Sequence, residues 1–490
     1  MSDFLITNST PTQIYSNNKM ERLFSQSLKV LEEIGCSVDH DDLLEIWEKR
    51  GLKVDRVKRR VCFTRDVIKE LLDPYPGKGS INEINKSGIN QFTENLVTER
   101  FPKKYPIGGF YPKVYDWKTK TSYLSNEKSF LEIVKAFNGL EEASCIERVV
   151  VINDYPQKIE PIMATALLIK NTNRPGFGDA YNADQIPYMI ELGEISTGVK
   201  NCLDFVSPFM CVISPLKITK DECDLIIAKV KRNVPVIATI MPSSGATSPV
   251  TREGTIILEL AETIAVWLNC LVLNPEAHVE VQFASSSFDM RTTQYCFSSP
   301  ETVLQDCASA QITQYFLKRP VHIACNFVNA KIPGVQATYE KMFKLWWCHQ
   351  FTGLTQFRVG LIDSGAAFSP VQALLDIEML ESVNAMFKAD IPEQDEFDFD
   401  DFRNIVEKGT TFLESEHTFR LFKDVLYMPK LFDFSPRESD EAELKKSESF
   451  LDRIQDKYDG MIASAPDYRA DEDICRSIDE VVKRAEKDLL

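Results

Sequence analysis

The feature that most constrains this chain is a series of four strand-then-helix units within residues 234–387. In each unit a short run rich in β-branched residues leads into polar residues and then into an amphipathic helix. Crossover helices return the chain to the same end of a sheet, so the strands of such units lie parallel. The pattern predicts an α/β fold, a closed (β/α)8 TIM barrel whose functional residues gather where the strands end. The four expected strands cover residues 234–241, 279–283, 322–327 and 356–362.

Three earlier apolar runs bring the number of expected barrel strands to seven, covering residues 148–153, 175–180 and 205–213. Periodicity leaves two sources open for an eighth strand, the extended segment near Pro106 and the C-terminal part of the chain. We expect a small N-terminal α+β lead-in and arm (1–105), a TIM-barrel domain (106–435) and a C-terminal helical layer (436–490). Residues 74–105 are rich in Pro, Gly, Asn and Lys, which predicts a linker or a long irregular arm.

The charge of the chain limits its partners. Its 490 residues carry a formal net charge of −17, with a sequence pI near 5.0. Nucleic-acid binders need dense Lys and Arg to displace counterions, so this balance argues against a nucleic-acid partner. A cationic ligand or a basic protein partner suits the negative electrostatic field of this chain better than a nucleic acid does. An acidic balance that only maintains solubility is the simpler interpretation.

Cysteine usage and the lack of targeting signals predict a cytoplasmic protein. Twelve cysteines occur without a CxxC pair, and several lie in apolar runs, which is typical of buried thiols in a reducing compartment. The N-terminus has neither the basic start nor the apolar core of a signal peptide. No apolar stretch reaches the ~18 to 20 residues that a membrane span requires, so we expect no membrane association.

Several long stretches, in the same order along the chain, resemble the trimethylamine methyltransferase (MttB-like) family. The N-terminal stretches are LEEIGCSVDHDDLLEIWEKRGLKVD (31–55) and GGFYPKVYDWKTKT (108–121). The central ones are MPSSGATSPVTREG (241–254), LVLNPEAHVEVQFASSSFDMRTTQYCFSSPE (271–301) and AKIPGVQATYEK (330–341). The last two are LIDSGAAFSPVQALLDIEML (361–380) and FLESEHTFRLFKDVLYMPKLFD (412–433).

This resemblance implies a TIM-barrel methyltransferase. In the family, a methyl group passes from a methylated amine to the cobalt of a corrinoid on a separate small protein, which docks over the barrel mouth. Members that demethylate trimethylamine carry pyrrolysine, which is not written in this sequence, and members without it are associated with quaternary amines such as glycine betaine. The resemblance thus implies no tightly bound cofactor, with the corrinoid (cobalamin) supplied by a partner protein. We also expect a homo-oligomer.

The chemistry of the implied reaction sets what a site must provide. Attack by Co(I) on a methyl carbon needs a good leaving group, and a quaternary nitrogen leaves as a neutral amine without receiving a proton. The site then has to hold the cation, exclude water and align the methyl group. Aromatic faces and carboxylates suit a trimethylammonium group, whereas a substrate carboxylate requires Arg, Lys or backbone N–H groups.

Four residues are candidates for a catalytic role. Asp289 and Arg291, in SFDMR after the strand at 279–283, match the family pattern and are expected at the barrel mouth. A bidentate pair that only stabilises the loop explains them equally well. Asp363 follows the strand at 356–362, where the family has an acidic residue beside glycines. His417, in SEHTF, matches the family's His-Thr pair, with a structural hydrogen bond as the alternative.

The substrate-binding candidates are polar or aromatic residues at expected strand ends. They are Ser243, Ser244, Thr247, Ser285, Asn326, Lys331, Asp179 and Tyr181. Helix capping or loop hydrogen bonding is the alternative role for the serines and for Asn326. The loop of Lys331 departs from the family, because Pro333 is followed by Gly334 where members commonly have Pro-Asp.

The sequence predicts no metal site. Its five histidines, at positions 40, 278, 322, 349 and 417, form no HxH or HxxxH set. Because the loops of Lys331 and Asp363 are altered, a non-catalytic barrel that binds or senses a small molecule is the main alternative function. A third hypothesis, a barrel lyase or hydrolase that acts on another small molecule, is supported by the expected fold alone.

Overall fold

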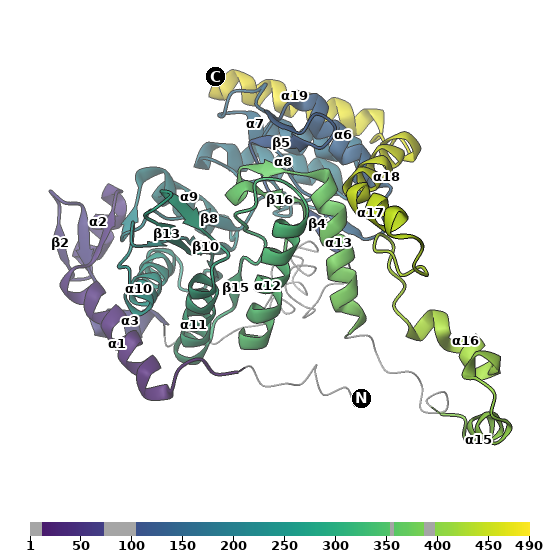
Figure 1. Cartoon of the computed structure of the whole chain (residues 1–490). Helices are drawn as coiled ribbons and strands as arrows, with labels where there is room; N and C mark the ends of the chain where they lie inside the picture. The colour runs from purple at the N-terminus through teal and green to yellow at the C-terminus, as the bar shows by residue number, and fades with distance from the viewer. Residues whose placement is uncertain (1–11, 73–103, 353–356, 387–396) are drawn as a thin grey trace.

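The computed structural model describes residues 12–72, 104–352, 357–386 and 397–490. Parallel strands are flanked by long helices, and the N-terminal elements pack at one edge of the body (Figure 1). The content is mixed α/β, as the sequence predicts. Most of the linker expected over residues 74–105 lies outside the described residues.

The N-terminal lead-in is fastened to the rest of the molecule. Its elements are α1 (Asn17–Glu33), β1 (Cys36–Val38), α2 (Asp41–Lys49), β2 (Lys53–Asp55), β3 (Arg60–Cys62) and α3 (Arg65–Leu72). The buried Trp47 indole donates a hydrogen bond of 2.9 Å to Asn269 in the core helix α10 (Arg252–Leu271). β1 also pairs in parallel with β9 (Lys217–Ile218). These contacts bury the apolar faces that so short an α+β unit cannot cover by itself.

Four parallel strands in the order β15-β12-β10-β8 form the centre of the body. They are β8 (Phe209–Cys211), β10 (Val236–Ile240), β12 (Val279–Phe283) and β15 (Val321–Ile323), and the crossovers are α9 (Lys220–Lys231), α10 and α11 (Pro300–Leu317). The parallel registers confirm the strand-then-helix units predicted for this region. The predicted bounds are right for β12. The strand predicted over 205–213 is too long, because β8 begins only after Pro208, which has no N–H to donate to a neighbouring strand.

Shorter parallel contacts extend this arrangement. β4 (Tyr105–Ile107) pairs in parallel with β7 (Ala143–Ile146), and β17 (Ala367–Phe368) with β5 (Lys113–Asp116). Single parallel bridges join residue 146 to 175 and residue 178 to 206. The region near Pro106 therefore provides a parallel strand, which is one of the two sources left open by the sequence.

Among the described residues the hydrogen-bonded strands form no closed ring, so the closed eight-stranded barrel stays a prediction. Within the described residues no ladder joins β15 to β16 (Leu361–Ile362). Backbone hydrogen bonds instead link the loops that follow them, from Asp363 to Ala330 at 2.7 Å and from Ser364 to Val328 at 2.8 Å. Asp363 and Ser364 have φ of 54° and 55°, so the chain bends away from an extended ladder there.

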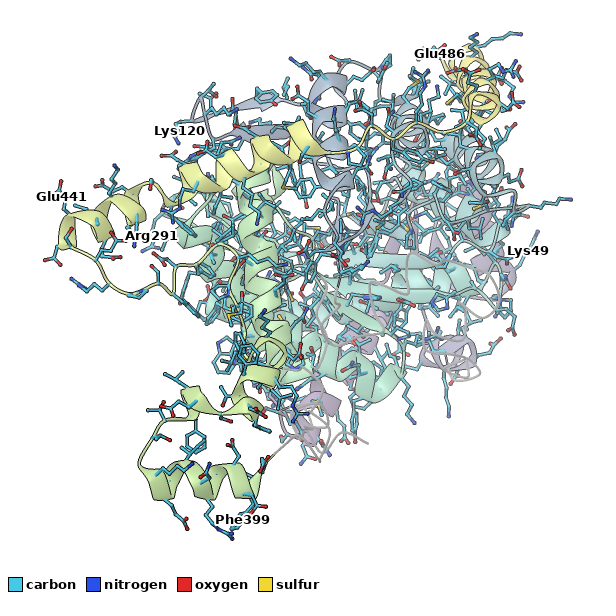
Figure 2. All side chains as sticks on the ribbon, turned by 90° about the vertical axis from the view of Figure 1, so that its right-hand side faces the viewer. Lys49, Lys120, Arg291, Phe399, Glu441 and Glu486 are labelled. Atoms are coloured by element: carbon cyan, nitrogen blue, oxygen red, sulfur yellow. The ribbon has the colours of Figure 1, made fainter. Side chains whose placement is uncertain are left out.

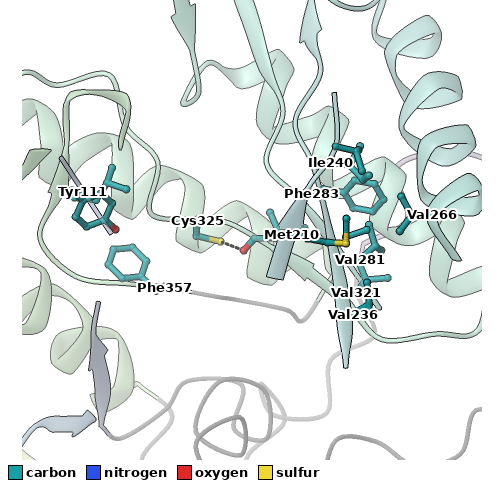
Figure 3. Packing of buried hydrophobic residues seen from close by; sticks show 14 of the residues in the cluster. Tyr111, Met210, Val236, Ile240, Val266, Val281, Phe283, Val321, Cys325 and Phe357 are labelled. Atoms are coloured by element: carbon teal, nitrogen blue, oxygen red, sulfur yellow. Dashed lines mark hydrogen bonds between the residues drawn. The ribbon is translucent and has the colours of Figure 1, made fainter. Parts of the chain in front are cut away.

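The outward face of the central strands packs against helices. Phe283 and Ile240 lie beside Val266 of α10, and Val281 neighbours Val321 of the next strand (Figure 3). All five side chains are buried. Because side chains alternate between the two faces of a strand, the residues between them point to the opposite, interior side.

Helices cover the remaining outer surface. They include α6 (Glu127–Asn138), α7 (Glu160–Asn171), α8 (Ile186–Thr197), α12 (Val335–Thr352) and α13 (Pro370–Ala385). The C-terminal helices are α17 (Asp440–Glu448), α18 (Phe450–Ser464) and α19 (Glu472–Leu489). α18 packs on α6 and α13, and α19 packs on α7 and α8, so the last residues form an outer layer. Between α13 and α17, the short helices α15 (Phe399–Lys408) and α16 (Glu416–Val425) project from the body (Figure 1).

One helix in the described part of the chain, α10, is long and apolar enough to cross a bilayer. In the structure 89% of its apolar window is buried. Its position between the sheet and α1 is that of a core helix.

A buried ion pair connects α12, α13 and the chain that enters β16. Lys341 Nζ lies 2.5 Å from Asp376 Oδ2, and both side chains are fully buried. The same carboxylate accepts a hydrogen bond of 2.7 Å from the Gly360 amide. Removing one partner of such a pair leaves an uncompensated charge in the core.

We expect Lys341→Met to lower the free energy of unfolding by about 3 to 5 kcal/mol, because the Asp376 charge is left without its partner. The double variant Lys341→Met/Asp376→Asn keeps an acceptor for Gly360 and removes the charge, so it should regain most of that loss. Urea unfolding midpoints of the three proteins measure both effects. Equal stability of the single and double variants would contradict this account.

Candidate functional site

The interior face of the central sheet carries a row of polar side chains. Strand register places Cys211 opposite Thr239, Thr239 opposite Gln282, and Gln282 opposite His322. In a parallel sheet, residues in register on neighbouring strands project to the same side. Gln282 Oε1 is buried and has no hydrogen-bond partner in the described structure, which leaves an acceptor available to a ligand.

Cys211 ends β8 on this face. The residue is exposed, while the surrounding protein and the charge of Asp179 raise the pKa of its thiol to about 11. Water therefore reaches the interior side of the sheet near Cys211.

A buried arginine lies between two aromatic rings in this interior. Arg358 Nε donates to Glu147 Oε2 at 2.9 Å, and the two side chains are 12% and 4% exposed. The guanidinium carbon is 5.6 Å from the Phe177 ring centroid and 5.1 Å from that of Phe209. Burial raises the pKa of Glu147, and Arg358 opposes that rise. The aromatic faces and the carboxylate together hold one cation in a desolvated position.

Asp179 and Tyr181, both predicted from the sequence, come together around a second arginine. Arg148 binds Glu160 at 2.7 Å, lies 3.9 Å from Asp179, and its guanidinium carbon is 4.9 Å from the Tyr181 ring centroid. Arg148 and Glu160 are 1% exposed, whereas the Asp179 side chain is 20% exposed. Glu160 neutralises Arg148, and the partly exposed carboxylate of Asp179 also interacts with the charges of Lys229 and Arg358.

The interior also contains a charged network that the sequence analysis missed. Glu280 accepts hydrogen bonds from His278 and, at 2.5 Å, from His322. Burial favours a higher pKa for Glu280, but these hydrogen bonds lower it to about 2. The spacing of histidines in the sequence could not reveal this set, because the two histidines meet at a glutamate of β12 and one of them, His322, lies on the neighbouring strand β15.

The predicted serines belong to hydrogen-bonded loops. Ser243 and Ser244 form β11 (Ser243–Ser244), which pairs in parallel with β13 (Ser286–Asp289). The Ser243 amide donates to Thr247 Oγ1 at 2.8 Å, and Ser244 Oγ donates to Gln305 at 2.9 Å. Ser285 donates to the buried Asp306 carboxylate. These contacts account for four predicted residues as loop structure, while the buried Ser243 hydroxyl has no partner in the described part of the chain.

Asp289 and Arg291 form the bidentate pair that the sequence allowed. Arg291 Nε and Nη2 each lie 2.9 Å from an Asp289 oxygen, and hydrogen bonding to Arg291 lowers the pKa of Asp289. The Arg291 side chain is 89% exposed. The pair stabilises the hairpin between β13 and β14 (Gln294–Cys296).

The remaining predicted residues occupy three places. Lys331 Nζ lies 2.8 Å from Asp363 Oδ1 in a partly exposed ion pair between two loops. Asn326 is buried and hydrogen-bonded to Tyr111, so it joins the interior. His417 lies in α16, on the segment that projects from the body in Figure 1, and the structure does not bring it to the interior.

No group of three or more His, Cys, Asp or Glu side chains suited to a metal ion occurs among the described residues. The arrangement instead brings together a partly exposed carboxylate, aromatic rings and an arginine paired with a glutamate. Such a site can hold a small cation, with or without an anionic group attached, away from bulk water.

The family model described as trimethylamine methyltransferase (MTTB) matches residues 2–489. The chain belongs to the trimethylamine methyltransferase family. This membership confirms the resemblance and makes the protein a methyltransferase.

Relatives within the family share about a quarter of the residues or fewer. Glycine betaine methyltransferase of Desulfitobacterium hafniense (strain Y51) is 24% identical over 86% of this chain and 87% of its own. Trimethylamine methyltransferase MttB of Methanosarcina barkeri (strain Fusaro / DSM 804) is 22% identical over 81% and 80%. L-carnitine:corrinoid methyltransferase of Eubacterium limosum is 22% identical over 70% of each chain. Among solved structures, Methanosarcina barkeri monomethylamine methyltransferase (MtmB) aligns over 99% of this chain and 90% of its own, with 14% identity and a TM-score of 0.49.

The burial of Lys229 next to Phe209 can be tested through the pH dependence of the stability of the protein. Its ammonium is buried and donates to the Phe209 carbonyl at 2.8 Å; burial lowers its pKa from 10.5 to about 8, and Asp179 opposes the shift. Between these two values the unfolded chain binds more protons than the folded chain, so stability rises with pH.

We expect the stability of the wild type, relative to Lys229→Met, to increase by about 2 kcal/mol from pH 7.5 to pH 10. Urea unfolding of both proteins at the two pH values measures the difference. A difference that stays constant with pH would show that Lys229 is solvated in the folded state.

Proposed function

We propose that this protein transfers a methyl group from a quaternary or other methylated amine of the betaine type to a corrinoid protein. The observation that carries the proposal is the partly exposed carboxylate of Asp179, beside the Tyr181 ring, on the interior side of the sheet. A cationic amine gains most where an uncompensated carboxylate and an aromatic face meet away from water. Family membership supports the reaction class.

The residues of this chain then act by position and charge. Asp179 and Tyr181 hold the ammonium group, and the docked corrinoid protein and the surrounding strands exclude water from the reacting carbon. The amine leaves without a proton, so no general acid is required. A corrinoid on the partner protein supplies the Co(I) nucleophile. The residues present fit this division of labour, because Asp179 and Tyr181 offer a carboxylate and an aromatic face to a cationic amine.

Arg358 favours a zwitterionic amine. Its guanidinium is the interior group suited to a substrate carboxylate, and the Phe177 and Phe209 rings fix its orientation. A betaine would place its ammonium at Asp179 and its carboxylate toward Arg358. The similarity to glycine betaine and L-carnitine methyltransferases supports this class.

We also propose that the strand segments complete a TIM barrel. Two contacts across the interior support closure. Arg358 binds Glu147, which directly follows β7, and Asn326, which follows β15, is hydrogen-bonded to Tyr111. The mouth, formed by the loops after β10, β12 and β15, is then the docking face for the corrinoid protein. Nine buried free thiols support a cytoplasmic setting.

Asp179→Asn should raise KM for a betaine at least tenfold with a small change in kcat, because an amide cannot neutralise the ammonium group. The assay mixes enzyme, cob(I)alamin and candidate betaines, and follows the loss of Co(I) absorbance together with release of the demethylated amine. Asp66→Asn, an exposed substitution in α3, is the matched control. A wild-type protein that is stabilised by a betaine but never consumes Co(I) would favour the non-catalytic alternative.

The role of Arg358 is tested with two substrates. The double variant Arg358→Met/Glu147→Gln removes the ion pair without leaving a buried charge. We expect it to raise KM for glycine betaine at least tenfold and to leave KM for tetramethylammonium, which has no carboxylate, nearly unchanged. Equal losses for both substrates would mean that the pair only maintains the fold.

A further inference from the structure

The loops that follow β10 and β12 meet in a short parallel ladder. β11 pairs with β13 at only two positions, Ser243 with Ser286 and Ser244 with Ser287. A ladder of this length has little stability of its own, because few hydrogen bonds offset the entropy lost when both segments are ordered. The ladder therefore needs support from another part of the fold.

Gln305 of α11 provides this support through both ends of its side-chain amide. Its Nε2 donates to Ser285 Oγ at 2.7 Å, and its Oε1 accepts a hydrogen bond of 2.9 Å from Ser244 Oγ. Ser244 lies in β11 and Ser285 directly precedes β13, so one side chain holds both segments of the ladder. Nε2 also lies 3.3 Å from Glu259 Oε1 in α10, which anchors the amide to a second helix.

The protons around Gln305 determine which way its amide points. Burial raises the pKa of Asp306 to about 6, with the charge of Lys344 opposing the rise, so this carboxylate is ionised at neutral pH and only accepts hydrogen bonds. Ser285 Oγ therefore donates its proton to Asp306 and can only accept from Gln305. The amide must then turn its NH2 group toward Ser285 and its oxygen toward Ser244.

The contacts of Gln305 are buried, in contrast to the tip of the hairpin that they hold. Gln305 is 2% exposed, Ser244 is 8% exposed and Ser285 is fully buried. Arg291, labelled in Figure 2, follows β13 in the same hairpin and is 89% exposed. Breaking either bond of Gln305 would leave a polar group unpaired away from water, so both serines are held firmly at the base of the hairpin.

We propose that Gln305 is a positioning residue, which holds the loops after β10 and β12 in place without touching the substrate. This inference rests on the proposed function, which makes these loops part of the mouth through which the corrinoid approaches. Methyl transfer requires the cobalt, the carbon and the leaving nitrogen in line, so a displaced mouth impairs the transition state more than the binding of the amine. The expected signature is a lower kcat at a nearly unchanged KM.

Gln305→Met keeps the length of the side chain and removes both hydrogen bonds to the serines. In the cob(I)alamin assay we expect kcat for glycine betaine to fall about tenfold, with KM within about threefold of the wild-type value. Gln311→Met is the matched control, because it is the same substitution in the same helix and removes hydrogen bonds to Thr12 and Phe351 instead. It should keep the wild-type kcat. Ser244→Ala, which removes one bond of Gln305, is a milder variant that should lower kcat in the same sense.

Amide hydrogen exchange tests the support of the ladder without substrate or cobalt. In Gln305→Met, peptides covering residues 241–249 and 284–290 should both exchange about tenfold faster than in the wild type, because both segments lose their anchor. Unchanged exchange in these peptides would overturn the inference, as would an equal loss of kcat in Gln311→Met. A wild type that transfers no methyl group from any betaine would instead overturn the proposed function, so the two failures are distinguishable.

Discussion

The interior of this protein depends on how it accommodates the buried charge of Glu147. A carboxylate in such a position is tolerated only beside a fixed cation, and Arg358, 211 residues further along the chain, provides it. Space for the pair comes from glycines, since a Cβ at Gly108 would collide with Glu147 and one at Gly176 would lie 2.9 Å from its Cγ. The strands around Glu147 can therefore approach one another only with these small residues in place.

The interior differs from the loops above it in how its charges are held. The loops are tied to themselves and to helices through Asp289 with Arg291, Lys331 with Asp363, and Ser285 with Asp306. In the interior, the partly exposed Asp179 lies 3.9 Å from the buried Arg148. Loops held in this way suit the proposed reaction, which depends on position more than on proton transfer.

The sequence predicted the parts of this arrangement that local pattern determines. The strand Val279–Phe283 was placed correctly, and Asp179 and Tyr181 were predicted as binding residues because they end an apolar run. Arg358, Glu147 and Glu280 were not assigned, because a charged residue inside an apolar run reveals neither its partner nor the face on which it lies. That information depends on register between strands that are far apart in sequence, which no local period contains. The closure of the barrel stays a prediction, and the positive φ values after Ile362, where the ladder is interrupted, are invisible to a hydrophobic pattern.

The thiol of Cys211 has a chemical consequence if a methyl donor binds beside Asp179 as proposed. A thiolate beside an activated methyl group would itself become alkylated, and the enzyme would inactivate itself. Because burial, with the charge of Asp179 adding to it, raises the pKa of the Cys211 thiol to about 11, this sulfur stays protonated at neutral pH and is a poor nucleophile. The surroundings of the thiol thus keep it from competing with cobalt for the methyl group.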